Sequence, residues 1–156
     1  MSEAIFVEGL TKKYGEKTVV NHLNFSVKRG TVFGLLGANG AGKSTTIECI
    51  LGTKKADEGT VRLLGQDPKK QRRSLFERVG VQFQEGDYQK EIKVNELCRE
   101  TASLYRKPAD WRTLCEQFGI GDKTKAAVKS LSGGERQRLF IVIALIPQPE
   151  IVFLDE

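Results

Sequence analysis

The chain has 156 residues, of which 39% are hydrophobic and 29% are charged, and it carries a formal net charge of +5. This length is sufficient for one domain with its own core, and the composition is that of an ordinary water-soluble fold. The longest apolar run, Leu139 to Ile146, is too short to cross a bilayer, and we expect no signal peptide. The three cysteines are far apart, which argues against a zinc site or a disulfide framework and fits a reducing cytoplasm.

The positive charge is concentrated in one short basic run. Lys69, Lys70, Arg72 and Arg73 lie close together, with no aromatic residue among them. Proteins that bind nucleic acid usually combine such residues with aromatic side chains on which bases stack. We therefore expect a solvated surface here and no nucleic-acid partner.

In chain order, the first segments predict strands. Residues 5–7 and 19–27 have strand-like composition, and residues 12–16 predict the turn between them, so we expect an antiparallel pair. A short apolar run at 31–36 predicts the next strand. A helix should follow over 44–51, ending at a glycine.

The middle of the chain changes from strands to helices. Residues 60–64 and 79–83 predict two more strands, with a helix over 68–78 between them. Apolar residues then recur at helical spacing over 94–105 and 109–118, and no strand pattern intervenes. This stretch predicts a helical insertion.

The last segments return to the alternating pattern. Residues 135–146 predict a helix that Pro147 and Pro149 bring to an end. The apolar run at 151–154 is typical of a strand that is buried on both faces, and an acidic pair, Asp155-Glu156, follows it.

A glycine-rich segment follows the strand predicted at 31–36. The run GANGAGKS, from Gly37 to Ser44, matches the phosphate-binding pattern G-x-x-x-x-G-K-[ST]. In such a loop, backbone N–H groups point at phosphate oxygens and the following helix presents its positive end, so crowded positions favour glycine. Lys43 would bridge the β- and γ-phosphates. The plain alternative is a glycine-rich turn that joins a strand to a helix.

Four segments occur together in one order along the chain. They are GANGAGKST at 37–45, Gln84 after a strand, LSGGERQR at 131–138 and IVFLDE at 151–156. Together they resemble the nucleotide-binding subunit of an ABC transporter, and the resemblance covers nearly the whole chain. LSGGERQR after a phosphate-binding loop is highly specific, whereas the last segment alone is common. The sequence GLLGANGAGKSTT around the loop resembles that of drug- and antibiotic-exporting subunits more than that of nutrient importers.

The resemblance implies an α/β fold, namely a P-loop NTPase core with a mostly parallel sheet, an N-terminal antiparallel β part and a helical insertion. The resemblance implies that residues 1–156 form one domain. The nucleotide-binding core covers 1–84, the helical insertion that ends in the LSGG signature covers 85–134, and the helix after this signature and the last strand cover 135–156. A complete subunit continues past the acidic pair with further strands and a histidine, whereas the one histidine here is His22. We therefore expect a truncated subunit with missing C-terminal strands, weak nucleotide binding, little hydrolysis of its own and self-association through an exposed sheet edge.

ATP is the ligand that the resemblance implies, with Tyr14 stacking on the adenine. A tyrosine packed on the sheet edge is the alternative for this residue. The phosphate tail would be bound by Gly37, Asn39, Gly40, Ala41, Gly42, Lys43, Ser44 and Thr45.

For hydrolysis, the resemblance implies three catalytic residues. Glu156 would act as general base towards the attacking water, Lys43 would bind the γ-phosphate, and Gln84 would orient the water. A polar residue at a strand end is the alternative for Gln84. Mg²⁺ is the second implied cofactor, and its ligands would be Ser44, Gln84 and Asp155.

The LSGG segment implies a partner subunit. Ser132, Gly133, Gly134 and Glu135 would contact the γ-phosphate of ATP bound to a second subunit, so two ATPase subunits would pair head to tail as a homo- or heterodimer. Ser132 is also a favourable helix N-cap, and both roles are compatible. Transmembrane permease subunits would be further partners, contacted through residues 85–93 and the insertion. The protein would then lie in the cytoplasm, on the inner face of the cell membrane.

Two other functions compete with a transport motor. A soluble ABC ATPase acting in translation or DNA repair usually has two cassettes or a long insertion, whereas the stretch between Gln84 and Leu131 is short. A regulatory nucleotide-binding module without turnover needs no general base, and Glu156 disfavours it.

Overall fold

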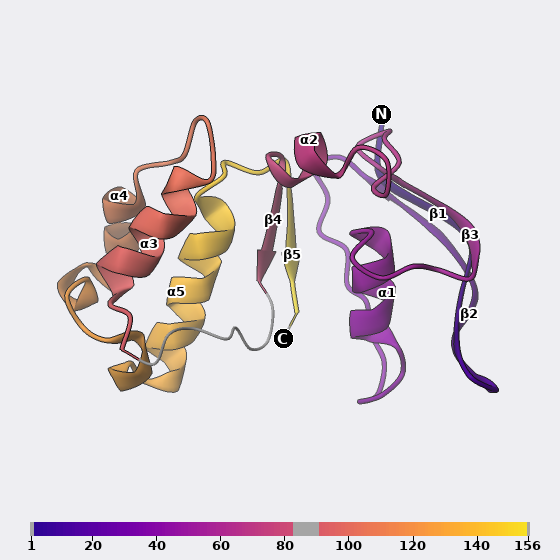
Figure 1. Cartoon of the computed structure of the whole chain (residues 1–156), viewed down its shortest axis with the longest axis horizontal. Helices are drawn as coiled ribbons and strands as arrows, with labels where there is room; N and C mark the ends of the chain where they lie inside the picture. The colour runs from indigo at the N-terminus through magenta and orange to yellow at the C-terminus, as the bar shows by residue number, and fades with distance from the viewer. Residues whose placement is uncertain (1, 83–90, 156) are drawn as a thin grey trace. The chain divides into compact units, whose positions relative to one another are not determined.

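The structure, a computed structural model, describes residues 2–82 and 91–155. The chain forms two compact units, Met1–Leu75 and Phe76–Glu156 (Figure 1). The predictions made for Gln84 and Glu156 lie outside the described residues. Within those residues, no helix is long and apolar enough to cross a membrane.

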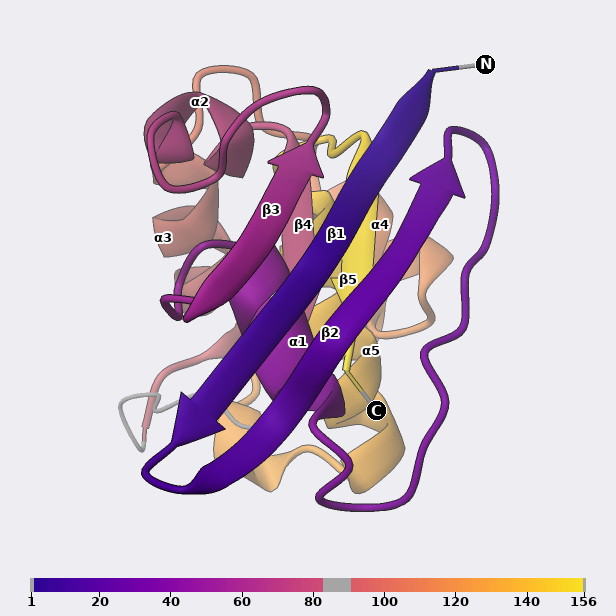
Figure 2. The ribbon, with the colours of Figure 1, turned by 90° about the vertical axis from the view of Figure 1, so that its right-hand side faces the viewer.

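The first unit is built on an antiparallel sheet of three strands in the order β2-β1-β3 (Figure 2). The strands are β1 (Glu3–Tyr14), β2 (Lys17–Lys28) and β3 (Glu58–Leu63). The central strand contributes most to the core, with Val7 and Leu10 almost fully buried. The predicted antiparallel β part is therefore confirmed.

The turn between β1 and β2 is shorter than predicted. Lys12 and Tyr14 belong to β1, and Tyr14 pairs with Lys17, which leaves two residues for the turn. Gly15 has a φ of 59°, as a tight hairpin turn requires. The prediction that residues 12–14 form a turn is wrong because cross-strand pairing continues through these polar positions.

The helix α1 (Lys43–Ile50) contacts β2 and β3 and lies on one face of the sheet (Figure 2). Its Cys49 and Ile50 are buried. The predicted helix is confirmed, beginning one residue earlier than expected. It ends at Leu51, and the next residue, Gly52, has a φ of 72°. This left-handed residue terminates the helix as the sequence predicted.

The segment from 31 to 36 is not a strand, so that prediction is wrong. Val32 and Leu36 are almost fully exposed, and Phe33 stacks on Phe25 with ring centroids 5.0 Å apart. Strand-like composition forms a strand only where a neighbouring strand supplies hydrogen-bond partners. No such pairing involves this segment within residues 2–82 and 91–155.

The predicted helix at 68–78 is also shorter in the structure. The helix α2 covers Arg72–Phe76, and turns occupy the residues before it. Leu75 is buried, as the apolar spacing predicted, whereas the basic residues of the run from Lys69 to Arg73 are exposed.

The second unit contains two parallel strands, β4 (Val79–Gln82) and β5 (Ile151–Leu154), in register from end to end. The prediction that the last strand is buried on both faces is wrong, since Val152 is 37% and Leu154 is 56% exposed. Among the described residues, β4 is the single partner of β5. Phe153 points the other way and is buried.

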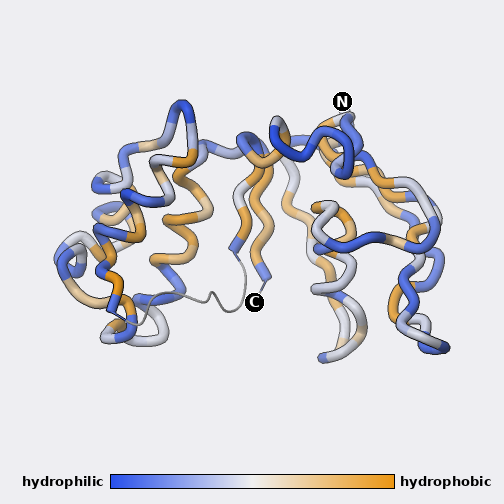
Figure 3. Tube along the Cα trace, in the orientation of Figure 1, coloured by the Kyte–Doolittle hydropathy of each residue, from blue (hydrophilic) through white to orange (hydrophobic). Residues whose placement is uncertain are grey.

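The described part of this unit also contains three α-helices, namely α3 (Val94–Ser103), α4 (Trp111–Gln117) and α5 (Gly133–Leu145) (Figure 1). Two short 3₁₀ turns, η1 (Gly121–Lys123) and η2 (Val128–Ser130), lie between α4 and α5. Figure 3 shows that apolar residues follow α5 along much of its length. The core joins all three helices through Val94, Cys98, Trp111, Cys115, Ile120, Leu139, Val142 and Ile146.

The backbone of α5 packs directly against the backbone of β4, without a side chain between them at Gly80. A Cβ atom on Gly80 would lie 2.0 Å from the carbonyl oxygen of Ala144 and 3.0 Å from a carbon of Pro149. Only glycine allows the strand and the helix to come this close. The first unit has an antiparallel sheet and the second has parallel strands that pack on a helix, and this mixture confirms the α/β class.

Candidate functional site

The glycine-rich loop before α1 forms a tight turn that depends on its glycines. Gly40 and Gly42 have φ values of 81° and 91°, in the left-handed region. The N–H of Ala41 donates to the carbonyl oxygen of Ala38 at 3.0 Å, which closes the loop. A Cβ atom on Gly42 would lie 2.6 Å from the carbonyl oxygen of Val19, so this position requires glycine both for its φ and for its space.

The start of α1 is open towards an anion. Gly42 is the N-cap, no side chain caps the helix, and its first turn contains no acidic residue. The first N–H groups of a helix have no partner inside it and carry a partial positive charge. A phosphate group would satisfy them, and Ser44 and Thr45 lie in this first turn.

The ammonium group of Lys43 lies across the same loop. Its Nζ donates to the carbonyl oxygens of Gly37 at 2.6 Å and Ala38 at 3.0 Å. The loop carbonyls therefore hold a positive charge next to the open helix end. The charge and the donors together suit a chain of phosphates.

Tyr14 lies at the end of β1 and is 45% exposed. The Nζ atoms of Lys12 and Lys54 are 5.1 and 5.7 Å from the centre of its ring. Lys54 also donates to Glu48 at 2.7 Å, and this bond, followed by the one to Tyr14, raises the pKa of Lys54. Because Glu48 belongs to α1, these contacts hold the aromatic ring beside the helix that begins at the loop.

The carboxyl ends of β4 and β5 lie at the same edge, and Asp155, which the sequence predicts as a metal ligand, follows β5 there. Gln82 is opposite Leu154, and the N–H of Asp155 donates to the carbonyl oxygen of Gln82 at 3.3 Å. Asp155 thus follows the end of β5 next to Gln82, the last residue of β4. Among the described residues, no cluster of three His, Cys, Asp or Glu residues could hold a metal ion.

The LSGG segment forms the N-terminus of α5. The N–H of Glu135 donates to Oγ of Ser132 at 3.2 Å, and the N–H of Ser132 donates to Oε2 of Glu135 at 2.9 Å. This is a capping box. The helix begins at Gly133, two residues earlier than predicted, because the reciprocal cap includes both glycines in the first turn.

Within residues 2–82 and 91–155, nothing requires glycine at the two glycines of this turn. Neither Gly133 nor Gly134 has a left-handed φ, and a Cβ atom on either would meet nothing within 4 Å. Glycine in a helix costs about 1 kcal/mol relative to alanine. No contact among the described residues offsets this cost, and the backbone of this helix end is bare.

Two contacts of charged side chains near the LSGG segment were not predicted from the sequence. The Nζ of Lys123 lies 3.7 Å from Oε1 of Glu135. The guanidinium of Arg136 donates to the carbonyl oxygens of Lys129 at 3.4 Å and Leu131 at 3.3 Å. The sequence carries no signal for the first contact, because the two partners lie on different elements whose approach depends on the fold.

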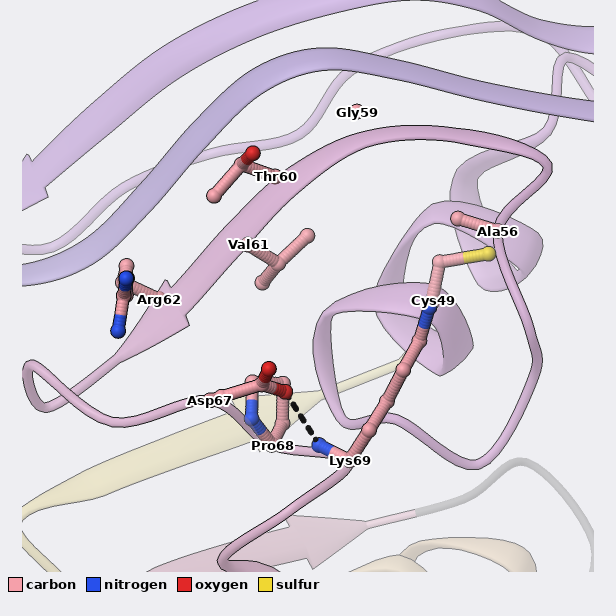
Figure 4. A pocket seen from close by; sticks show the side chains of 9 residues that line it. All are labelled: Cys49, Ala56, Gly59, Thr60, Val61, Arg62, Asp67, Pro68 and Lys69. Carbon is pink, nitrogen blue, oxygen red and sulfur yellow. Dashed lines mark hydrogen bonds between the residues drawn. The ribbon is translucent and has the colours of Figure 1, made fainter.

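A separate cavity of about 140 Å³ lies in the first unit, between α1, β3 and the turn that follows (Figure 4). Cys49, Pro68 and Lys69 line it, and the N–H of Lys69 donates to Asp67 at 2.9 Å. None of the loop residues from 37 to 45 belongs to its lining. The cavity is therefore distinct from the glycine-rich loop.

Known proteins share sequence similarity with this chain over nearly its whole length. The family model described as ABC transporter matches residues 20–156. The Nod factor export ATP-binding protein I of Ralstonia nicotianae is 40% identical in an alignment of 155 positions that covers 96% of this chain and 48% of that protein. The bacitracin transport ATP-binding protein BcrA of Bacillus licheniformis is 35% identical in an alignment of 159 positions that covers 100% of this chain and 52% of that protein. The chain spans about half the length of the curated relatives it matches.

Solved structures give the same result for the fold. An ATP-binding subunit of an ABC transporter superposes with a TM-score of 0.84 at 24% identity, covering 96% of this chain and 64% of that one. An ATP-binding cassette of another ABC transporter superposes with a TM-score of 0.81 at 26% identity, covering 97% and 68%. The loop before α1, the capped LSGG helix and the matched family model agree, and the chain belongs to the ABC transporter family of ATP-binding proteins.

Proposed function

We propose that the chain provides the ATP-binding and ATP-hydrolysing part of a subunit that drives an exporter in the cell membrane. The observation that carries this proposal is the bare backbone of Gly133 and Gly134 at the start of α5. The loop that ends in Lys43 is already one complete anion site. A second exposed helix end therefore suits the phosphates of a nucleotide that is held by another subunit.

Two subunits would thus pair head to tail, and each ATP would lie between one glycine-rich loop and the partner's signature. In a two-fold symmetric dimer, the loop of each subunit would face the signature of the other, so the same contact occurs twice and the assembly stops at two subunits. Ser132 and Glu135 cap each other, so they hold the helix end in place without covering the glycines.

Within one subunit, the residues would divide the work along the nucleotide. Tyr14 would stack on the adenine through its exposed ring, and the Lys43 ammonium would neutralise the phosphates. Mg²⁺ prefers oxygen ligands, which the Ser44 hydroxyl and the Asp155 carboxylate offer; the ion would neutralise charge on the phosphates. Gln84 and Glu156 would orient and deprotonate the attacking water.

The remaining partners would be membrane-spanning permease subunits, with the ATP-binding protein on the inner face of the membrane. This proposal rests on the names of the relatives, which concern Nod factor export, bacitracin transport and daunorubicin resistance. The absence of a membrane-spanning helix among the described residues is compatible with a peripheral subunit.

The catalytic proposal is tested by Glu156→Gln. We expect this variant of the full protein to lose most ATP turnover but to retain ATP binding. The glutamine side chain has the same shape as glutamate, but its amide cannot accept a proton from the attacking water. Glu100→Gln, at an exposed position of α3, is the matched control. Turnover that is unchanged in Glu156→Gln would contradict the assignment.

The head-to-tail arrangement is tested by mixing two variants. In a Glu156→Gln background, which slows hydrolysis, Lys43→Ala removes the loop charge and Gly134→Asp blocks the signature. Each variant alone should fail to pair in the presence of ATP, as measured by sedimentation. The mixture should pair, because each mixed dimer retains one intact site made of a loop from one subunit and a signature from the other. A mixture that behaves like its components would rule out the arrangement.

A further inference from the structure

The carboxylate of Glu135 is held in one position by two contacts on different elements. Its Oε2 accepts the N–H of Ser132 at 2.9 Å, and its Oε1 lies 3.7 Å from the Nζ of Lys123. Lys123 is the last residue of η1, and its ammonium also lies 4.0 Å from Asp122. The backbone bond from Ser132, and then the charge of Lys123, lower the pKa of Glu135, so the carboxylate is ionised at neutral pH.

An ionised carboxylate is unfavourable beside a nucleotide phosphate. Under the proposed function, the helix end at Gly133 and Gly134 faces the γ-phosphate of a partner's ATP. Glu135 is the next residue in the same turn. Like charges brought together at an interface oppose association unless an opposite charge compensates them.

We infer that Lys123 is a positioning residue for the ATP shared between two subunits. Its ammonium lies beside the Glu135 carboxylate, which accepts the Ser132 N–H, and offsets the negative charge that this carboxylate brings close to the two glycines. Arg136 is the neighbouring cation, but its guanidinium is occupied by the carbonyl oxygens of Lys129 and Leu131. The inference deepens the proposed function and rests on it.

The first test compares Lys123→Gln with Lys125→Gln, its matched control at an exposed position two residues later. Both are made in the full protein with Glu156→Gln, and ATP-dependent pairing is measured by sedimentation at low and high salt. We expect Lys123→Gln to weaken pairing about twofold to fivefold, the range for a partly exposed charge pair, and the loss to shrink at high salt. Lys123→Arg should restore pairing, and the melting temperature of the unpaired protein should not change.

The second test separates positioning from a merely structural contact. In a Glu135→Gln background the negative charge is gone, so Lys123→Gln should have no further effect on pairing. Equal losses in Lys123→Gln and Lys125→Gln, or a Lys123→Gln loss that persists in Glu135→Gln, would overturn the inference and leave the proposed function intact. If the parent protein itself does not pair with ATP, the proposed function fails and the inference fails with it.

Discussion

Gly40 and Gly42 have similar left-handed backbones, but they differ in the space around them. A Cβ atom on Gly42 would collide with the carbonyl oxygen of Val19, whereas one on Gly40 would meet nothing within 4 Å. Gly42→Ala should therefore lower the free energy of unfolding by about 2 to 4 kcal/mol, and Gly40→Ala by about 1 to 2 kcal/mol from backbone strain alone. Urea unfolding measures both values. Equal losses would mean that the contact with Val19 is relieved by a small movement of β2.

A second prediction at this scale concerns pH. Oδ2 of Asp57 accepts the N–H of Lys13 at 2.6 Å and lies 3.5 Å from the Nζ of Lys12. The backbone bond, and then the charge of Lys12, hold the pKa of Asp57 below its usual value. The folded state therefore binds this proton at lower pH than the unfolded chain, so the stabilisation is complete above the unfolded pKa and is lost as pH falls through the folded pKa.

The titration of the Asp57 carboxyl carbon, followed by NMR, measures this shift directly. The midpoint should lie below about 3.9, the value for an unstructured aspartate. Asp57→Asn should flatten part of the acid-side decline in stability, and Asp110 and Glu135, whose pKa values are also lowered, contribute to the decline that remains. A midpoint at the ordinary value would show that the contacts with Lys12 and Lys13 do not persist in solution.

At the scale of elements, the sequence predicted most helices and strands because their signals are local. The apolar spacing of α3 and α5, the prolines after α5 and the glycine after α1 each act within one or two turns. The motif spacing also predicted that the loop leads directly into a helix. The residues that bind and hydrolyse ATP remain predictions, and of these Gln84 and Glu156 lie outside the described residues.

The errors occur where structure depends on distant partners. Residues 31–36 have the composition of a strand, but no described neighbour pairs with them. Residues 12–14 look like a turn, yet they pair across the hairpin. The contact between Lys123 and Glu135 and the close approach at Gly80 involve different elements, so no periodicity or motif reveals them.

The approach of β4 to α5 gives the prediction at this scale. Gly80→Ala places a methyl group where the Ala144 carbonyl oxygen already lies, so the strand and helix must separate. We expect the free energy of unfolding to fall by about 1 to 3 kcal/mol or more, as for other overpacked cores. Gly34→Ala, at a position with open space and no left-handed φ, is the control and should change stability by less than about 0.5 kcal/mol. A Gly80→Ala loss no larger than that of the control would mean that the packing adjusts without cost.

At the scale of the whole molecule, exposed apolar side chains predict association between chains. Val32 and Leu36 are 103% and 92% exposed, and they lie in a segment without a strand partner among the described residues. Apolar surface of this kind favours contact with another molecule. We expect the 156-residue chain to self-associate as its concentration rises, even without nucleotide, which separates this contact from ATP-dependent pairing.

Light scattering over a range of concentrations tests this expectation. A double variant, Val32→Lys with Leu36→Lys, should shift the chain towards monomer, because burying two ammonium groups at the contact is costly. Leu104→Lys is the control, since Leu104 is 75% exposed but lies in the other unit, after α3. If the unmodified chain stays monomeric at high concentration, the exposed segment does not drive association. If Leu104→Lys reduces association as much as the double variant, the contact lies elsewhere or depends on net charge rather than on residues 31–36.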